Sequence, residues 1–399
     1  MQSALRGSSA AYRTAIVTCG VFFAAGLTLA ALGPSLPILA LRIGVDIAAL
    51  GGLFTATSVG VIIAQLGVVR AGRRFDQRTI LAASVLLMGV GGMAIAQGGA
   101  LSTLFAAALL SGLGFGGVVA TGNTLVARLF PGRSAAALNG INLFFGVGAM
   151  VGPAIAGAAN ARFNAPQLAL WVGGGLMAAL APVVLGAAAR SVSGAASTSG
   201  ARVAAPPRSW LFGLMLLVYT GTEIGFGAWL TLYMVSSAAL DLVSAALVVS
   251  GFWLALTSGR ALAATLGGQI SVYGLLKLCL IGLLLGTILL TLSIGNLVIT
   301  CIGVLLFGLS CGPIFPTVIA LVSSSTPGST ATSMVLAMGN SGGLLVPALI
   351  GLLLTRYGPP AVAGLLVLAA LLMIGLGAAA MRPSPGSSNQ SPPAPLPQG

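Results

Sequence analysis

The sequence contains no histidine, and only four of its 399 residues are Asp or Glu. Without histidine the chain cannot assemble a histidine-based zinc site or a Ser-His-Asp triad. The acidic residues are scattered, so we expect neither a metal site nor a cofactor. The cysteines lie within apolar segments without C-x-x-C spacing, which favours a role as small hydrophobic residues for Cys19, Cys279, Cys301 and Cys311. These absences exclude the corresponding enzyme classes, and we expect no enzymatic activity.

Charged residues make up only 5% of the chain, against about 25% in soluble globular domains. Hydrophobic residues make up 57%, in repeated runs longer than the roughly 18 residues that mark a membrane-spanning helix. Barrel strands would be short and alternating, and these runs are neither. The 17 basic residues lie almost entirely in short loops, where membrane topology explains them, so we expect no nucleic-acid partner. The sequence therefore predicts an all-α integral membrane protein.

Apolar runs separated by loop signals predict twelve transmembrane helices. The first six are residues 14–39, 47–70, 79–97, 100–128, 135–161 and 166–189. The second six are residues 210–236, 240–265, 271–292, 295–322, 329–355 and 359–381. The predicted domains are an amino-terminal bundle at 1–189, a cytoplasmic linker at 190–209, a carboxy-terminal bundle at 210–381 and a disordered cytoplasmic tail at 382–399.

The arginines predict that both termini are cytoplasmic. With the amino terminus inside, twelve arginines fall on the cytoplasmic side, and only Arg42, Arg162 and Arg356 fall outside.

The two halves of the chain repeat each other. The segment Leu110–Gly117, L-S-G-L-G-F-G-G, aligns with Leu306–Pro313, L-F-G-L-S-C-G-P, at an offset of 196 residues. The same offset pairs further residues: Pro131 and Gly132 with Pro327 and Gly328, Ala135 with Ala331, and Gly146 with Gly342. Two parallel six-helix repeats place an axis along the membrane normal, with a cavity between the halves.

Glu223 is the only acidic residue deep inside an apolar segment. A charged side chain at the centre of a lipid-facing helix costs about 3 kcal/mol on insertion scales, so it usually faces a bundle interior or a water-filled cavity. Burial would favour the neutral carboxyl group, which could then load and release a proton as the cavity opens to alternate sides. The sequence marks Glu223 as a candidate proton-coupling or substrate-binding residue. The alternative is a structural hydrogen bond to a neighbouring helix.

Four stretches carry a resemblance to a known family: G-L-T-L-A-A-L-G-P-S-L-P-I-L at Gly26–Leu39, L-N-G-I-N-L-F-F-G-V-G-A-M-V-G-P at Leu138–Pro153, Y-T-G-T-E-I-G-F-G-A-W-L-T-L-Y at Tyr219–Tyr233 and S-G-R-A-L-A at Ser258–Ala263. With these four stretches in this order, the chain resembles the major facilitator superfamily over essentially its whole length. Within that superfamily it resembles the fucose-permease-like sugar:proton symporters. The resemblance implies a monomer in the cell inner membrane that works by alternating access. Its implied partners are a small-molecule substrate, protons and membrane lipid.

The loop between the second and third predicted helices departs from the superfamily pattern G-x-x-x-D-R-x-G-R-R. It reads G-V-V-R-A-G-R-R-F-D-Q-R at Gly67–Arg78, with the aspartate displaced to Asp76. We expect a cytoplasmic gate here, formed by Arg70, Arg73, Arg74, Asp76 and Arg78. Arg260, near the cytoplasmic end of its helix, is expected to join this gate or to snorkel toward the interface. The fucose-permease resemblance also implies acidic groups in the amino-terminal half, and this sequence has none inside a span there.

Aromatic and amide side chains within the spans are the candidate substrate contacts. Tyr219 shares the face of Glu223, while Trp229 and Tyr233 are spaced to pair with one another. An aromatic ring with amide and carboxylate partners suits a sugar, although Trp229 and Tyr233 could instead belong to an interfacial belt. The amide residues within the spans are Gln65, Asn123, Asn142 and Asn340. Alternatively, these side chains form hydrogen bonds that hold neighbouring helices together.

The sequence thus predicts a secondary transporter that moves a small polar solute, a sugar in the favoured interpretation, with proton coupling through Glu223. The alternative within transport is proton-driven efflux of drugs or metabolites, because the cavity is poor in charge. A different class is a non-transporting membrane sensor, and the absence of an extra soluble domain speaks against it.

Overall fold

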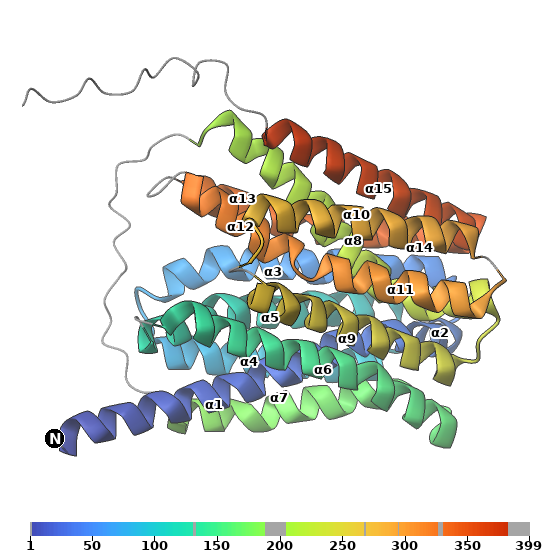
Figure 1. Ribbon diagram of the computed structural model, residues 1–399. Helices are drawn as coiled ribbons and strands as arrows, with labels where there is room; N and C mark the ends of the chain where they lie inside the picture. The colour runs from blue at the N-terminus through green and yellow to red at the C-terminus, as the bar shows by residue number, and fades with distance from the viewer. Residues whose placement is uncertain are drawn as a thin grey trace, which may run out of the picture.

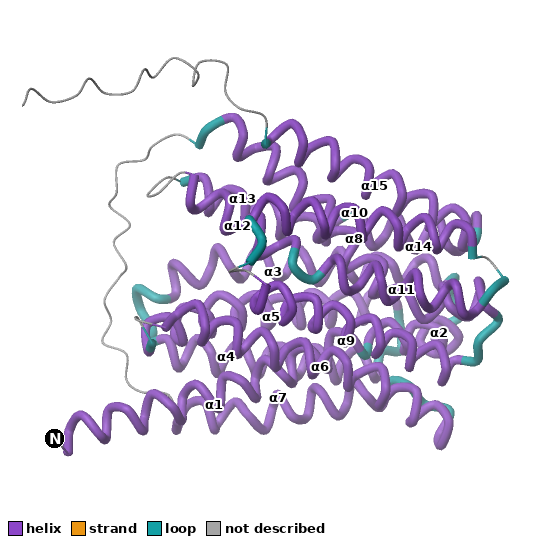
Figure 2. Tube along the Cα trace, viewed as in Figure 1, coloured by secondary structure: helices purple, strands orange, loops and turns teal. Residues whose placement is uncertain are grey.

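The computed structural model describes residues 2–130, 133–187, 205–266, 269–293, 295–325 and 330–381. These residues form long helices that run alongside one another, and the start of α1 lies at the same end of the bundle as the end of α15 (Figure 1). Loops connect the helices at the two ends of the bundle (Figure 2). Twelve helical stretches in the described residues are long and apolar enough to cross a membrane. The predicted all-helical fold with twelve spans is confirmed.

The first six spans are formed by α1 Gln2–Ala30 with α2 Leu32–Ile43, η1 Ile47–Gly51 with α3 Gly52–Ala71, α4 Gln77–Gln97, α5 Leu101–Leu129, α6 Ser134–Phe163 and α7 Leu168–Ala187. The second six are formed by α8 Pro207–Ala238, α9 Leu242–Leu266, α10 Val272–Leu292, α11 Leu297–Cys311 with α12 Ile314–Ser325, α13 Ala331–Ser341 with η3 Gly342–Leu344 and α14 Val346–Tyr357, and α15 Pro359–Ala380.

Most of the predicted linker and the whole predicted tail lie outside the described residues. The seventh span begins at Pro207, three residues before the predicted start at 210. A proline is well suited to this position, because the first residues of a helix have no intrahelical acceptor for an N–H group.

Close helix contacts at glycines repeat between the two halves. A side chain at Gly112 of α5 would meet the Thr57 carbonyl of α3, and one at Gly308 of α11 would come within 2.8 Å of the Phe252 carbonyl of α9. Gly112 and Gly308 are a pair related by the offset of 196 residues. The fourth span therefore packs on the second as the tenth packs on the eighth, which gives the sequence repeat a structural meaning.

Three of the spans contain an interruption that the sequence analysis did not predict. The breaks fall at Ala31, at Gly312–Pro313 and at Gly342–Leu345. A proline lies four residues after Ala30, Gly312 and Gly343, respectively: Pro34, Pro316 and Pro347. Proline has no N–H group to donate to the carbonyl four residues earlier, and its ring displaces that carbonyl, which weakens the helix at these points. Proline alone does not decide the break, because α2, α6 and α7 remain continuous across Pro37, Pro153 and Pro182.

The two halves meet along three lines of contact: α2 packs against α8, α6 packs against α9, and η1 and α3 pack against η3 and α14. Two hydrogen bonds join α3 to the eleventh span, one at η3 and one at α13. Thr55 Oγ1 donates to the Leu344 carbonyl at 2.6 Å, and Asn340 Nδ2 donates to Gln65 Oε1 at 3.2 Å. The Leu344 carbonyl lies within the break in the eleventh span, so an interrupted helix contributes to the contact between the halves.

Candidate functional site

Glu223 lies near the middle of α8 and is 8% exposed. Its Oε1 atom lies 3.2 Å from Nη2 of Arg260 on α9. The Glu223 side chain is 11% exposed and that of Arg260 is 32% exposed, so the carboxylate is the more enclosed partner. A buried carboxylate without a partner is costly, and Arg260 supplies the partner.

Arg260 is held in place by the break in the tenth span. Its Nε atom donates to the Gly312 carbonyl at 3.2 Å. That carbonyl has no helical donor four residues on, because Pro316 stands there. A Cβ atom at Gly312 would come within 3.1 Å of the Arg260 backbone nitrogen, so glycine permits the close approach of α9. The sequence C-G-P-I-F-P at 311–316 thus creates both the acceptor and the space that position the guanidinium.

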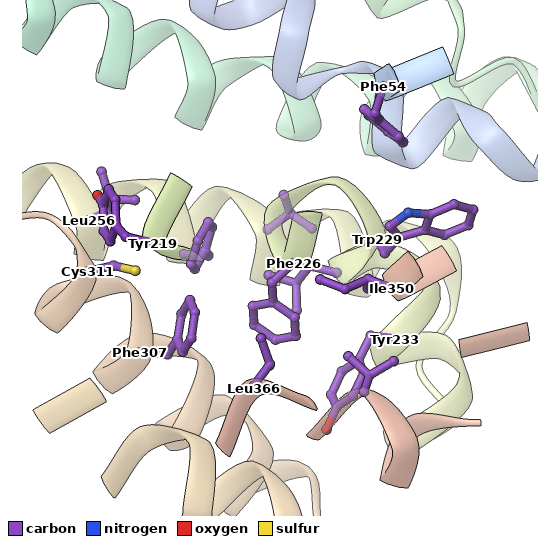
Figure 3. Close-up of a cluster of buried hydrophobic side chains, with 14 of the residues drawn as sticks. Phe54, Tyr219, Phe226, Trp229, Tyr233, Leu256, Phe307, Cys311, Ile350 and Leu366 are labelled. Carbon is purple, nitrogen blue, oxygen red and sulfur yellow. The ribbon is translucent and has the colours of Figure 1, made fainter. Parts of the chain in front are cut away.

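Tyr219 lies one turn from Glu223 on α8 and is fully buried. Its hydroxyl group lies close enough to interact electrostatically with Glu223 and Arg260, but it forms no hydrogen bond of acceptable geometry with any described residue. The ring packs against Phe315 with the centroids 6.3 Å apart, and Figure 3 shows Cys311 and Leu256 beside it. Tyr219 therefore brings an unpartnered donor to the ion pair.

Trp253 lies two turns from Arg260 on the same face of α9. Its ring lies against α8, where a Cβ atom at Gly227 would come within 3.2 Å of it. The indole Nε1 atom is buried and has no hydrogen-bond partner in the part of the chain that the structure describes. The sequence analysis did not identify Trp253 as a site residue. Its spacing of seven residues from Arg260 places both on one face of a helix and could have indicated it.

Trp229 and Tyr233 are both buried, and each has its polar atom on a backbone carbonyl. Trp229 Nε1 donates to the Pro347 carbonyl at 2.8 Å, and the Tyr233 hydroxyl donates to the Leu290 carbonyl at 3.4 Å. Their rings contact Phe54 and Phe226, respectively, and point in different directions (Figure 3). Neither residue lies in a lipid-facing belt, because they are 1% and 0% exposed.

The four predicted amides do not gather around Glu223 in one group. Asn340 and Gln65 bond to each other across the halves, as described above. Asn142 is exposed and donates to the Leu138 carbonyl of its own helix at 2.8 Å. Asn123 is half-buried on α5, and its Oδ1 atom is buried without a hydrogen-bond partner among the described residues.

Three of the predicted gate arginines lie together at the end of α3. Arg70, Arg73 and Arg74 line a hollow of about 470 Å³ with Ala71 and Phe75. Asp76 is the N-cap residue of α4, where its carboxylate accepts from the Thr79 amide at 2.8 Å and pairs with Arg78 at 3.0 Å. The Thr79 amide first, then the Thr79 hydroxyl and Arg78, lower the pKa of Asp76. The displaced aspartate thus caps a helix within its own loop.

Arg260 was predicted at the cytoplasmic gate or as a snorkelling residue, and the structure places its guanidinium on Glu223. The other acidic residues, Asp46, Asp76 and Asp241, all accept backbone amides at helix starts. This leaves Glu223 as the acidic partner within the spans. The pairing could have been anticipated because Arg260 lies six residues inside the end of its helix, deeper than an interfacial arginine needs to be.

Comparison with known proteins identifies the family to which the chain belongs. Residues 18–331 match the Major Facilitator Superfamily, so the chain belongs to this family of membrane transporters. It is 27% identical over 347 residues to an uncharacterized MFS-type transporter of Yersinia pestis, a match that covers 83% of this chain and 86% of that protein. It is 30% identical over 122 residues to the 4-hydroxybenzoate transporter PcaK of Pseudomonas aeruginosa, a match that spans 31% of this chain and 27% of that transporter.

Solved transporter structures share the fold. A mutant of the nucleoside transporter NupG aligns with a TM-score of 0.75 over 93% of this chain and 99% of its own, at 13% identity. A bacterial homolog of the human lysosomal transporter Spinster, in an inward-facing and occupied conformation, aligns with a TM-score of 0.73 over 94% of this chain and 96% of its own, at 12% identity. The resemblance to the major facilitator superfamily, a family of multi-pass membrane transporters, is therefore confirmed.

Proposed function

We propose that the chain is a proton-coupled secondary transporter of a small polar solute in the cell inner membrane, and that Glu223 carries the coupling proton. The ion pair between Glu223 and Arg260 carries this proposal. Protonation of the carboxylate removes its negative charge and breaks the ion pair, and release of the proton restores it. Proton binding to Glu223 therefore changes the contact between α8 and α9.

The position of the pair supports a link between this change and alternating access. α8 packs against α2 and α9 packs against α6, so both helices that carry the pair also contact the amino-terminal half. Breaking or forming the pair changes the relative stability of arrangements of these helices, which is how a bound proton shifts a conformational equilibrium. In this scheme Arg70, Arg73 and Arg74 stand at the cytoplasmic mouth.

Two solute classes have support. Sugars are the class that the sequence resemblance implies, and the unpartnered hydroxyl of Tyr219 and indole of Trp253 are donors that a polar solute could use. The match to 4-hydroxybenzoate transporters adds small organic acids, although it covers only 31% of the chain. Trp229 and Tyr233 are weaker candidates for solute contact, since their polar atoms already bond to backbone carbonyls.

The test is solute-driven proton movement in liposomes that contain the purified full-length chain and a pH-sensitive dye. The external solutes are a panel of hexoses, deoxyhexoses, amino sugars, sugar acids and small aromatic acids. We expect at least one solute to acidify the liposome interior in wild type. In Glu223→Gln, we expect solute exchange to persist while proton movement is lost, because glutamine imitates the protonated carboxyl group.

The matched control is Asp241→Asn, which neutralises an exposed carboxylate that caps α9 while keeping a good capping residue. It should move protons like wild type. Proton movement in Glu223→Gln equal to that of wild type would refute the proposed role of Glu223. Alkalinisation of the interior upon solute addition would instead assign the chain to proton-driven efflux.

A further inference from the structure

We infer that the transported solute carries a carboxylate, which takes the place of Glu223 on Arg260 while Glu223 is protonated. This inference rests on the proposed function, because it uses the proton that Glu223 is proposed to carry. It assigns the substrate class as small organic anions, and it assigns Arg260 as the group that binds the anion.

The charges of the site support this assignment. Ionised Glu223 and Arg260 together have no net charge. A proton alone would leave Arg260 unpaired in the membrane interior, and an anion alone would leave a net negative charge. A proton and a carboxylate together restore neutrality. An unpaired charge is costly in this environment, so the empty and the doubly loaded sites are the two states that can reorient at low cost.

The same argument disfavours a neutral solute. If Glu223 became protonated beside a neutral sugar, Arg260 would keep its charge and lose its ionised partner. Arginine remains protonated in proteins, so it cannot remove the charge by releasing a proton. A solute carboxylate compensates that charge, and it couples each anion to one proton.

Hydrogen-bond donors dominate the site. Arg260 uses Nε for the Gly312 carbonyl and Nη2 for Glu223, and its guanidinium has five N–H groups in total. Within the described part of the chain, the buried Tyr219 hydroxyl beside it forms no hydrogen bond of acceptable geometry, and the Trp253 indole nitrogen on the same face of α9 has no partner. An ionised carboxylate accepts hydrogen bonds and donates none, so it suits these donors.

The groups that face Glu223 include no second acid in the described part of the chain. They are Arg260 from α9 and Cys311 from α11, together with Tyr219 from α8 itself. A protonated Glu223 therefore leaves no other protein carboxylate there to pair with Arg260. The guanidinium then offers its charge and its N–H donors to an anionic group of the solute.

Binding to Glu223→Gln provides the first test, because this variant presents Arg260 without its acidic partner. Three acids are each compared with a neutral analogue of similar shape: acetate with acetamide, benzoate with benzamide, and glucuronate with glucose. We expect at least one acid to bind at least about tenfold more tightly than its analogue at neutral pH, measured by tryptophan fluorescence and by thermal shift. Absence of an acid preference in all three comparisons would overturn the inference.

Two further variants show whether Arg260 causes the preference. Glu223→Gln with Arg260→Lys keeps the positive charge and should keep a weaker acid preference. Glu223→Gln with Arg260→Met removes it and should abolish the preference. An acid preference that survives Arg260→Met would assign the anion to another group and refute the inference. If Glu223→Gln does not fold, the same binding measurements are made on wild type. The affinity of wild type for the acids must then increase as the pH is lowered from neutral to mildly acidic.

Transport separates failure of this inference from failure of the proposed function. Uptake of a proton with a monocarboxylate is electroneutral, so a pH gradient should drive it and an imposed membrane potential should not change its initial rate. Proton-coupled uptake of a neutral solute, lost in Glu223→Gln, would uphold the proposed function and overturn the inference. Anion uptake that needs Arg260 but ignores the pH gradient would uphold anion binding and overturn proton coupling.

Discussion

Glu223 and Arg260 join α8 to α9 through a contact of 3.2 Å between Oε1 and Nη2. The pair depends on a third element, because the Gly312 carbonyl at the break between α11 and α12 accepts from Arg260 Nε. The ionised carboxylate, the guanidinium and the interrupted helix are therefore one unit. Changing one member should alter the others, and this dependence can be measured as a coupling energy.

Removal of Arg260 alone should destabilise the protein more than removal of both charges. Arg260→Met leaves Glu223 buried without its partner, at a cost of up to about 3 kcal/mol, reduced because the arginine side chain is 32% exposed. Addition of Glu223→Gln should recover most of the loss. Thermal unfolding of wild type, both single variants and the double variant in detergent gives the coupling energy. Strictly additive effects would show that the two side chains do not stabilise each other.

Trp229 anchors the seventh span to the eleventh. Its Nε1 atom donates to the Pro347 carbonyl at 2.8 Å, and the residue is 1% exposed. Trp229→Phe keeps an aromatic ring but removes this hydrogen bond and leaves part of the buried indole volume unfilled, so we expect a loss of about 1–3 kcal/mol in the free energy of unfolding. The measurement is thermal unfolding in detergent.

Trp210→Phe is the matched control for Trp229, because Trp210 lies on the same helix and is 53% exposed. It should change the unfolding temperature little. Equal effects of the two substitutions would indicate that the hydrogen bond to Pro347 contributes nothing measurable.

The fold could be predicted because its determinants are local in the sequence. Long apolar runs specify membrane helices, and the matched glycines and prolines of the two halves indicate a repeat that the contacts of Gly112 and Gly308 reflect. The interruptions were missed, although the prolines were visible. Hydropathy averages over a whole span, whereas a break depends on the single carbonyl that each proline leaves without a donor.

The site was predictable only in part. Glu223 could be singled out because an isolated intramembrane acid is rare, and Tyr219 because it lies one turn away on the same helix. The partnership with Arg260 depends on how α9 is placed against α8 and α11, which no periodicity within one helix specifies. Trp229 and Tyr233 were suggested by their chemistry, but their burial and backbone partners are set by packing against other spans.

The repeat-related glycines should be intolerant of a side chain. An added Cβ atom at Gly112 would overlap the Thr57 carbonyl, and one at Gly308 would lie 2.8 Å from the Phe252 carbonyl. Both neighbours are backbone atoms that cannot rotate away. Alanine at either position should therefore cost about 1–3 kcal/mol by forcing the helices apart, with a larger effect at Gly112.

Gly364→Ala is the control for these glycines, since Gly364 lies within α15 and an added Cβ atom would meet nothing within 4 Å. It should be neutral or should stabilise by up to about 1 kcal/mol through helix propensity. Thermal unfolding of the three variants distinguishes the cases. If Gly112→Ala behaves like Gly364→Ala, the contact between α3 and α5 is looser than the structure indicates.

The loop before α4 should give stability that depends on pH through Asp76. Hydrogen bonds from Thr79 and the ion pair with Arg78 lower the pKa of Asp76 from its ordinary value of 3.8. Because the pKa is lower in the folded state, the contribution of the charge is fully present above about pH 3.8 and is lost as the pH falls through the folded value. Asp76→Asn retains a capping side chain but not the charge, so it should be less stable than wild type by about 0.5 kcal/mol at neutral pH. The difference should shrink toward zero as the pH falls well below 3.8, where Asp76 approaches the neutral form in both states. A difference in unfolding temperature that is the same at both pH values would show that the capping geometry, rather than the charge, stabilises this loop.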